Sequence, residues 1–313
     1  MENMAEVHEF ILLGLAYEHR ERYTLFVMFL LLYLASLLGN GAILAVAIAE
    51  PQLHTPMYFF LGNLSCLDIC YSTVTVPKML GGFLTEHQAI SFIECLVQLH
   101  FFYFLGSGEG ILLGVMAFDR YVAICNPLCY TVIMNKWACL LLAGATWAAG
   151  FFHALMHTVL TSRLWFCGPN HVQHFFCDIK PLLKLACSCT ALNLRLLNIV
   201  TGSIALGAFF LTLLSYFYII SFLFFKVQSW KSRWKAFSTC ASHLTVVALM
   251  YIPVLSNYML ASTGESAERE MIVTILYSAI TPILNLLIYT LRNQEVKSAL
   301  KKIFSKKYFF GRI

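Results

Sequence analysis

The feature that most constrains this chain is a series of long apolar stretches. Five stretches contain no Asp, Glu, Lys or Arg, and two more contain a single carboxylate each, Asp68 and Glu109. Each is long enough for the about 20 residues that a helix needs to cross a hydrocarbon core about 30 Å thick. The sequence therefore predicts an all-α membrane protein, a bundle of seven transmembrane helices. The predicted spans are 23–49, 57–77, 95–118, 137–162, 196–225, 236–262 and 271–291.

Composition excludes the other broad classes of protein. Only 12% of the 313 residues are charged and 59% are hydrophobic, whereas soluble domains carry about 25% charged residues. The 15% aromatic content argues against disorder, and eleven cysteines are too few for a small disulfide scaffold of this length. A net charge of +5 is modest, so we expect no nucleic acid partner and a multi-pass protein of the plasma membrane.

The distribution of basic residues predicts the orientation of the bundle. With the N-terminus outside, thirteen of the 21 Lys and Arg residues fall on cytoplasmic segments, many of them in the tail, as the positive-inside rule requires. Residues 1–22 would then be extracellular, 23–291 the membrane domain and 292–313 the cytoplasmic tail. Apolar residues alternate with lysines over 293–304 at helical spacing, which predicts a short amphipathic helix on the inner leaflet after the seventh span.

Polar groups inside the spans are the first candidates for function. Asp68 and Glu109 would lie in mid-membrane, and Asn40 and Asn285 add amides at similar depth. Charged groups there are costly and commonly functional, so a cluster that holds a cation or water and rearranges is one hypothesis. Hydrogen bonds that simply hold the helices together are the other.

Two further sets of residues suggest local chemistry. His153 and His157 are four residues apart, so they share a helix face as metal ligands often do, but no carboxylate or cysteine lies nearby to complete a site. We therefore predict no metal and no cofactor. The chain also lacks a phosphate-binding loop and other enzyme signatures, so we expect no enzyme.

The cysteines of the outer side indicate disulfides. These cysteines are odd in number, so at least one stays unpaired within the chain. A bridge from Cys95 to the long loop over 163–195 would pin a lid across the bundle. The outer cysteines are Cys95, Cys167, Cys177, Cys187 and Cys189.

Several sequence blocks together resemble the olfactory receptors, the large tetrapod-type class within the rhodopsin-type G-protein-coupled receptors. Asp119-Arg120-Tyr121 closes the third span, and Phe-Cys-Asp stands at 176–178 of the outer loop. The remaining blocks follow in the family's order from one end of the chain to the other. They are 10–15, 53–61, 116–128, 181–185, 235–247 and 282–293.

This resemblance implies an odorant receptor that binds a small molecule, activates a heterotrimeric G protein of the stimulatory olfactory type and raises cyclic AMP, in contact with membrane lipid. It also implies the disulfides Cys95–Cys177 and Cys167–Cys187, and a polar cluster of Asn40, Asp68, Glu109 and Asn285. The residues implied in the switch and in G-protein contact are Asp119, Arg120, Tyr121, Tyr216, Lys235, Ser238, His243 and Tyr289.

Helical spacing and the family template together predict the ligand site. The predicted lining is apolar and aromatic, with a few hydroxyls and no fixed charge, which suits small uncharged molecules. Packing within the bundle is the alternative role for each aromatic residue. The predicted lining residues are His100, Tyr103, Gly106, Ser107, Val200, Thr201, Ile204, Tyr251, Leu255, Tyr258 and Ser278.

Two rival functions remain, and the chain departs from the family pattern at several positions. A chemoreceptor of a tissue other than the nose would have the same sequence features, and a small transporter or channel is favoured only by Asp68 and Glu109. Leu286 replaces the usual proline, and Cys189 stands where an aspartate is usual. The N-terminal segment also lacks the usual glycosylation sequon, which predicts inefficient delivery to the cell surface.

Overall fold

The computed structural model contains seven helices that are long and apolar enough to cross a membrane, which confirms the predicted bundle. It describes residues 9–13, 19–85, 88–258, 267–292 and 298, so the predicted amphipathic helix over 293–304 lies outside the described residues. The first four spans are α1 (His19–Ala49), α2 (Pro56–Leu84), α3 (Phe92–Cys125) and α5 (Lys136–Ser162). The fifth combines α7 (Ala191–Leu196), η3 (Leu197–Thr201) and α8 (Gly202–Phe225). The sixth is α9 (Trp230–Tyr258), and the seventh combines α10 (Ala267–Ile275), η4 (Leu276–Ile280) and α11 (Thr281–Arg292).

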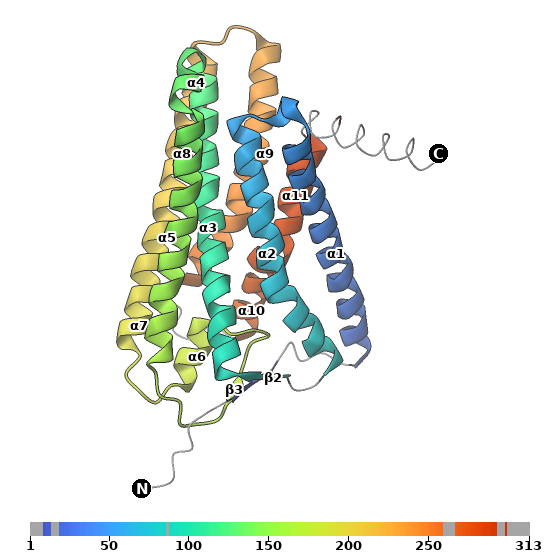
Figure 1. The fold of residues 1–313 in the computed structure, drawn as a ribbon, viewed down its shortest axis with the longest axis vertical. Coiled ribbons are helices and arrows are strands. Elements are labelled where there is room, and N and C mark those ends of the chain that lie inside the picture. Colours follow the sequence, from blue (N-terminus) through green and yellow to red (C-terminus); the bar gives the residue numbers. More distant parts are fainter. Residues whose placement is uncertain (1–8, 14–18, 86–87, 259–266, 293–297, 299–313) are drawn as a thin grey trace.

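The spans run side by side, and different connecting elements lie at the two ends of the bundle (Figure 1). At one end lie the connections η1 (Pro51–Leu53), η2 (Pro127–Cys129) and α4 (Tyr130–Ile133). At the other end lie α6 (Ile179–Leu185) and three short strands. Under the predicted orientation, the end with α4 is cytoplasmic and the end with α6 is extracellular.

Local sequence signals explain where the third and fourth spans begin. The Ser91 hydroxyl accepts a hydrogen bond from the Glu94 backbone N–H, and the Glu94 carboxylate accepts one from the Ser91 N–H, so the two residues form a capping box. The Asn135 side chain caps α5 by accepting from the Ala138 N–H at 3.0 Å. Both caps satisfy backbone donors that lie at the ends of the spans.

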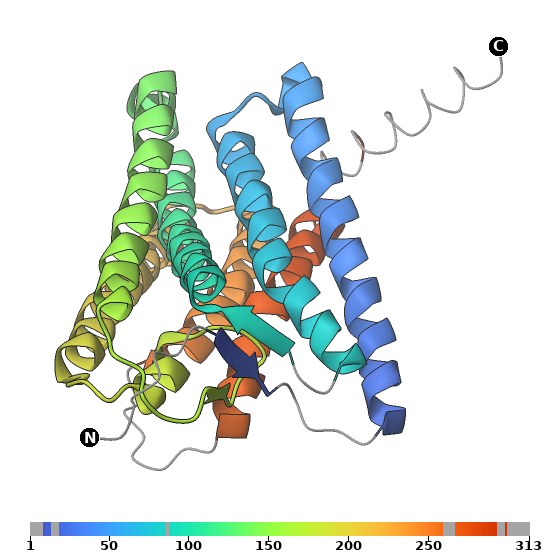
Figure 2. The same cartoon turned by 60° about the horizontal axis from the view of Figure 1, so that its bottom comes forward.

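The strands form a small sheet on the outer end, in the order β2–β1–β3 (Figure 2). β1 (Glu9–Leu12) pairs antiparallel with β2 (Gln88–Ser91) and parallel with β3 (His171–Val172). Phe10 of β1 is fully buried, and its ring meets the Phe166 ring edge-on at 5.2 Å. Residues 9–12 are therefore packed against the outer loop.

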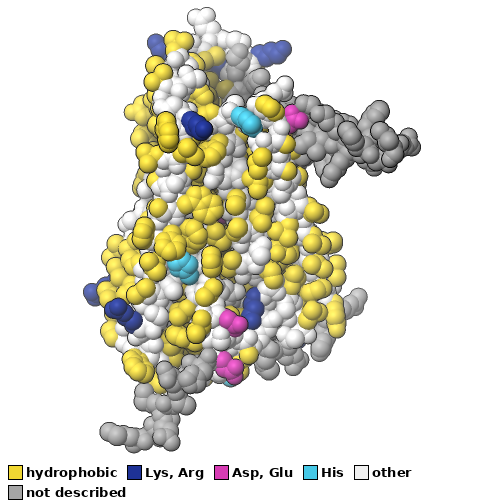
Figure 3. Space-filling model, viewed as in Figure 1, with side chains coloured by type: hydrophobic (Ala, Val, Ile, Leu, Met, Phe, Trp, Pro, Cys, Tyr) yellow, Lys and Arg dark blue, Asp and Glu magenta, His cyan; other side chains and the backbone are white. Residues whose placement is uncertain are grey.

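The lateral surface of the bundle is apolar. Large side chains such as Leu38 and Phe217 are 74% and 65% exposed on the helices. On the face shown in Figure 3, charged side chains gather toward the two ends and hydrophobic ones cover the middle. This pattern suits a lipid environment. Helices that pack closely in lipid depend on small residues at their contacts. At Gly150 of α5, an added Cβ would stand 2.7 Å from the Phe104 carbonyl oxygen, so glycine allows α3 and α5 to meet.

Candidate ligand cavity and signalling contacts

A small cavity of about 50 Å³ lies between α2, α3, the fifth span, α9 and η4. A volume of this size holds only a few water molecules. No side chain of the lining carries a formal charge, and most are aromatic or aliphatic. The lining residues are Tyr71, Phe102, Tyr103, Gly106, Ser107, Gly110, Thr201, Ile204, Ala205, Met250, Tyr251, Val254, Tyr258 and Tyr277.

Seven of the eleven predicted pocket residues line this cavity. They are Tyr103, Gly106, Ser107, Thr201, Ile204, Tyr251 and Tyr258.

The other four predicted residues do not line the cavity. The His100 ring bonds to Thr158 at 3.2 Å and packs edge-on against Phe151, on the side of α3 that faces α5. Val200 and Leu255 are half-buried neighbours of lining residues. Ser278 is buried within η4, where the π-helical turn changes the face that each residue presents.

Two lining residues, Tyr71 of α2 and Tyr277 of the seventh span, are not among the predicted ones. Tyr71 and Tyr277 line the cavity and are almost completely buried. The Tyr277 hydroxyl lies 3.3 Å from the Thr274 hydroxyl. Helical spacing alone could not predict these two rings, because it does not define how each helix is rotated about its axis relative to its neighbours.

Tyrosine hydroxyls tie the cavity wall to its surroundings. Tyr251 donates a hydrogen bond of 2.6 Å to the carbonyl oxygen of Gly110 on α3. Tyr103 donates one of 2.7 Å to the Asp178 carboxylate, and the Tyr258 hydroxyl lies 3.2 Å from that of Tyr103. Three lining tyrosines therefore have fixed partners on other parts of the fold.

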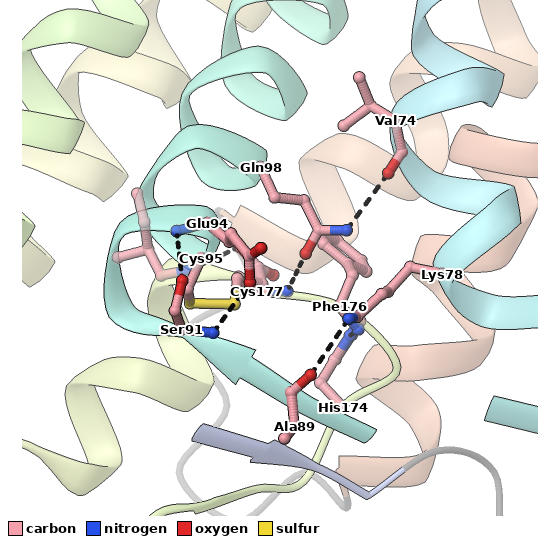
Figure 4. Close-up of a disulfide and its surroundings, with 12 residues drawn as sticks. Val74, Lys78, Ala89, Ser91, Glu94, Cys95, Gln98, His174, Phe176 and Cys177 are labelled. Carbon is pink, nitrogen blue, oxygen red and sulfur yellow. Dashed lines mark hydrogen bonds between the residues drawn. A yellow bond between two sulfur atoms is a disulfide. The ribbon is translucent and has the colours of Figure 1, made fainter. Parts of the chain in front are cut away.

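The outer loop contacts the cavity wall at Tyr103 and Phe102 and is anchored to α3. Cys95 is bonded to Cys177 with a Cα–Cα distance of 5.4 Å. The Gln98 side chain accepts from the Cys177 N–H at 2.9 Å and donates to the Val74 carbonyl of α2 at 3.2 Å (Figure 4). The disulfide and the hydrogen bond from Cys177 hold the loop against α3, and the bond from Gln98 to Val74 joins this part of α3 to α2.

Buried ionisable groups lie on both sides of Cys177 in this loop. Burial raises the pKa of the Asp178 carboxyl, while hydrogen bonds from Tyr103 and the Ile179 N–H oppose that rise. Burial, helped by the positive charge of Lys184, lowers the pKa of His174 to about 3, and the His174 ring stacks on Phe175. Charge on either group would be costly in this loop.

The second outer disulfide closes the loop on itself. Cys167 is bonded to Cys187 with a Cα–Cα distance of 6.0 Å, and Cys189 is exposed and not disulfide-bonded. The structure therefore contains the two disulfides that the resemblance implies, and the fifth outer cysteine, Cys189, is in neither of them.

Three of the four residues of the mid-membrane cluster meet directly. The Asn285 amide donates to Asp68 at 3.3 Å and to Glu109 at 3.0 Å. The Glu109 Oε2 atom is buried and has no hydrogen-bond partner among the described residues. Asn40 instead donates to the Pro282 carbonyl at 3.4 Å, so it holds α1 to α11 next to the cluster.

The predicted switch residues form separate contacts at the cytoplasmic end. Asp119 accepts a hydrogen bond of 2.8 Å from the Tyr130 hydroxyl of α4, and the Arg120 guanidinium contacts the Met57 sulfur at the start of α2. The rings of Tyr121 and Tyr218 lie 5.8 Å apart.

The fifth and sixth spans are joined in the same half of the bundle. The Tyr216 hydroxyl of α8 and the His243 Nδ1 atom of α9 lie 2.8 Å apart. Ser238 is half-buried on α9. The side chains of Lys235 and Tyr289 lie outside the described residues.

Histidines form a polar contact behind the cavity. His153 and His157 are both buried, and their Nε2 atoms lie 3.2 Å apart. Within the described part of the chain, no group of three or more His, Cys, Asp or Glu side chains could hold a metal ion.

A bundle of seven membrane helices with an uncharged internal cavity beneath an anchored loop defines a membrane receptor for small molecules. The family model for olfactory receptors matches residues 29–307. The chain is 59% identical to human olfactory receptor 12D1 over 306 residues, 98% of this chain and 96% of that protein. It is also 59% identical to human olfactory receptor 12D3 over 309 residues, 99% of this chain and 98% of that protein. Identity to human olfactory receptor 1F1 is 45% over 307 residues, 98% of each chain.

The chain therefore belongs to the olfactory receptor family. It is a multi-pass membrane protein with the role of an odorant receptor, and it is not an enzyme. This assignment agrees with the expectations from its spans and motifs.

Proposed function

We propose that this receptor binds small, uncharged and mostly apolar molecules in the cavity and activates a stimulatory heterotrimeric G protein, which raises cyclic AMP. The single observation that carries the proposal is the lining of the cavity. Its aromatic and aliphatic wall carries no formal charge, and burial of a charged ligand against such a wall would be costly. Volatile molecules with few polar atoms meet this requirement.

The small volume of the cavity supports a mechanism for activation. A ligand of six or more heavy atoms needs more room than about 50 Å³, so it must displace side chains or whole helices. A ligand shifts a conformational equilibrium when it binds one arrangement better than the other. Ligands of this size would therefore favour an expanded arrangement of α3, α8 and α9.

Two contacts of α9 offer a route from the cavity to the cytoplasmic end. Tyr251 lines the cavity and bonds to Gly110, next to Glu109 of the mid-membrane cluster. Lower on the same helix, His243 meets Tyr216 at 2.8 Å. Movement of α9 would break both contacts together, because α9 is one continuous helix from Trp230 to Tyr258.

The mid-membrane cluster supports a switching role. Two buried carboxylates share one amide, and they need a proton or a bound cation to offset the cost of burial. Rearrangement of the helices around Asn285 would change how strongly the two carboxylates hold a proton or a cation.

The cytoplasmic residues complete the proposal. Release of Arg120 from Met57 and of Asp119 from Tyr130 would free them for the G protein, and Lys235 and Ser238 on α9 would lie at the docking face. Tyr121 and Tyr289 would join the same rearrangement.

A cyclic AMP assay tests this proposal. Cells that express the chain are exposed to small alcohols, aldehydes, ketones, esters and hydrocarbons, and to carboxylates and amines as charged controls. We expect responses to some uncharged compounds, no response to the charged ones, and loss of the response in cells without the stimulatory α subunit. A response that persists without that subunit would contradict the coupling, and a preference for charged compounds would contradict the ligand class.

A further inference from the structure

His153 of α5 connects two hydroxyl groups of the cavity wall. Its Nδ1 atom lies 2.7 Å from the Ser107 hydroxyl of α3, and its Nε2 atom lies 3.0 Å from the Thr201 hydroxyl of η3. Ser107 and Thr201 both line the cavity, whereas His153 is 5% exposed and does not line it. One buried ring thus holds the two hydroxyls on its opposite nitrogens.

The chemistry of imidazole fixes what these hydroxyls can offer. A neutral imidazole has one N–H donor and one acceptor nitrogen. The hydroxyl that faces the donor nitrogen must accept from it, which leaves that hydroxyl's hydrogen to be donated into the cavity. The other hydroxyl must donate to the ring, which leaves its oxygen lone pairs as acceptors. In either tautomer of His153, the wall therefore presents one donor and one acceptor.

The neighbouring histidine allows the two roles to be exchanged. The Nε2 atom of His157 lies 3.2 Å from the His153 Nε2 and 3.5 Å from the Thr201 hydroxyl. When His153 carries its proton on Nδ1, its Nε2 accepts from the Thr201 hydroxyl, and a His157 protonated on Nε2 can donate to the oxygen of the same hydroxyl. When the proton of His153 is on Nε2, the Thr201 hydroxyl accepts it, and the unprotonated Nε2 of His157 is a second acceptor nearby. Both tautomers therefore keep their hydrogen bonds.

Three tyrosine hydroxyls of the wall are less adaptable. Tyr251 donates to a backbone carbonyl, Tyr103 donates to the Asp178 carboxylate, and Tyr258 meets Tyr103. A ligand oxygen that used these groups would have to break bonds that hold the helices and the loop in place. Ser107 and Thr201 can bond a ligand while they keep their bonds to His153.

We propose that His153 is a positioning residue that orients the Ser107 and Thr201 hydroxyls into an anchor for one neutral oxygen of the ligand. The inference rests on the proposed function and makes its ligand class more specific. Alcohols, aldehydes and ketones are the preferred ligands, and hydrocarbons of the same shape are poor ones. Because the donor and the acceptor exchange with the tautomer, an alcohol and a carbonyl compound on one carbon skeleton bind with similar affinity.

The test uses three sets of shape-matched probes. These are hexan-1-ol, hexanal and heptane; cyclohexanol, cyclohexanone and methylcyclohexane; and benzyl alcohol, benzaldehyde and ethylbenzene. Binding is measured as thermal stabilisation of the purified receptor, and activation as cyclic AMP in cells. We expect at least one set in which both oxygen compounds are about tenfold more potent than the hydrocarbon, the effect of about one hydrogen bond, and within about threefold of each other.

Substitutions then assign the preference to the three residues. In His153→Leu, Ser107→Ala and Thr201→Val, the oxygen-to-hydrocarbon potency ratio should fall toward one, with the hydrocarbon potency changed by less than about threefold. A purely structural role of His153 would weaken all three probes of a set together. Thr158→Val is the matched control, because Thr158 also lies on α5 and meets a histidine, His100, away from the cavity.

The outcomes separate this inference from the proposed function. Equal binding of oxygen compound and hydrocarbon by the unchanged receptor, or an unchanged ratio in His153→Leu, would overturn the inference while cyclic AMP signalling could persist. Selective binding without any cyclic AMP response would support the anchor and contradict the proposed signalling. Failure of all nine probes to bind would contradict both.

Discussion

The Tyr251 hydroxyl donates a hydrogen bond of 2.6 Å to the carbonyl oxygen of Gly110, so a residue of the cavity wall on α9 is bonded to the backbone of α3. The adjacent residue on α3 is Glu109, which accepts from Asn285 of α11. Tyr251 is 1% exposed, and its ring also lies 5.7 Å from that of Phe209 on α8. One side chain therefore contacts the cavity, α3 and α8, and stands next to the mid-membrane cluster.

We expect Tyr251→Phe to raise signalling without ligand. The substitution keeps the ring in the cavity wall but removes the bond between α9 and α3, which contributes about 1 kcal/mol. If that bond holds the resting arrangement, its loss shifts the equilibrium roughly fivefold. Cyclic AMP without ligand, normalised to receptor at the cell surface, measures the change.

Tyr251→Ala provides the comparison. It removes the bond and the ring, so ligand potency should also fall by an order of magnitude or more, and Tyr258→Ala should weaken ligands similarly. Unchanged basal cyclic AMP in Tyr251→Phe would show that this bond does not restrain the receptor.

Arg120→Ala should abolish the ligand-driven rise in cyclic AMP while the receptor still reaches the surface. The guanidinium lies at the cytoplasmic end of α3 near the start of α2, far along the bundle from the cavity, so ligand binding should persist. Surface staining and ligand-induced thermal stabilisation serve as controls. Full signalling by this variant would contradict the proposed mechanism.

The outer loop should lose stability at acidic pH because of His174. Its pKa is lowered by burial from 6.5 to about 3, so only the unfolded loop binds a proton between pH 6.5 and 3. Folding stability must then fall as the pH drops below 6.5, by about 2 kcal/mol at pH 5. The raised pKa of Asp178 acts in the opposite direction, so the prediction concerns the difference between the unchanged receptor and His174→Gln.

Melting temperatures of the purified receptor at pH 7 and pH 5 test this difference. The decrease on acidification should be smaller in His174→Gln than in the unchanged receptor. His171→Gln in the same loop is the control, because His171 is exposed, and it should behave like the unchanged receptor. Equal decreases in all three proteins would refute the role of His174.

Gly39 should be required because of Leu286, which stands where the family usually has proline. A Cβ at Gly39 would lie 2.0 Å from the Leu286 Cδ2 atom, so α1 and α11 meet through this leucine. Gly39→Ala should therefore cost about 1–3 kcal/mol of stability by overpacking. The double variant Gly39→Ala with Leu286→Ala should recover part of that loss, and strictly additive losses would contradict the contact.

The sequence predicts the bundle well because the membrane imposes a simple rule on length and polarity. It predicts the cavity less well, because the spacing along one helix does not define its rotation against the others. Ser107 and Thr201 could be selected as wall residues, but their common partner His153 lies on another span. Tyr71 and Tyr277 were missed for the same reason.

The outer end illustrates a second limit. Motif resemblance points to the two cysteine pairs that the structure joins, yet nothing in 9–12 predicts that this segment forms the central strand of a sheet. Strands of four residues or fewer carry little periodicity, and their pairing depends on distant partners such as Ile90 and Val172.

In the proposed mechanism, ligands act by entering the cavity between α3, α8 and α9. The most direct measurement is the cyclic AMP response to the active compounds in Ala205→Phe, which places a ring into that space. Gly207→Phe is its control, because Gly207 lies on the same helix and an added Cβ there meets nothing within 4 Å. We expect that Ala205→Phe at normal surface level loses the response or needs at least tenfold more ligand, while Gly207→Phe responds normally. Unchanged potency in Ala205→Phe would show that ligands do not act from this cavity.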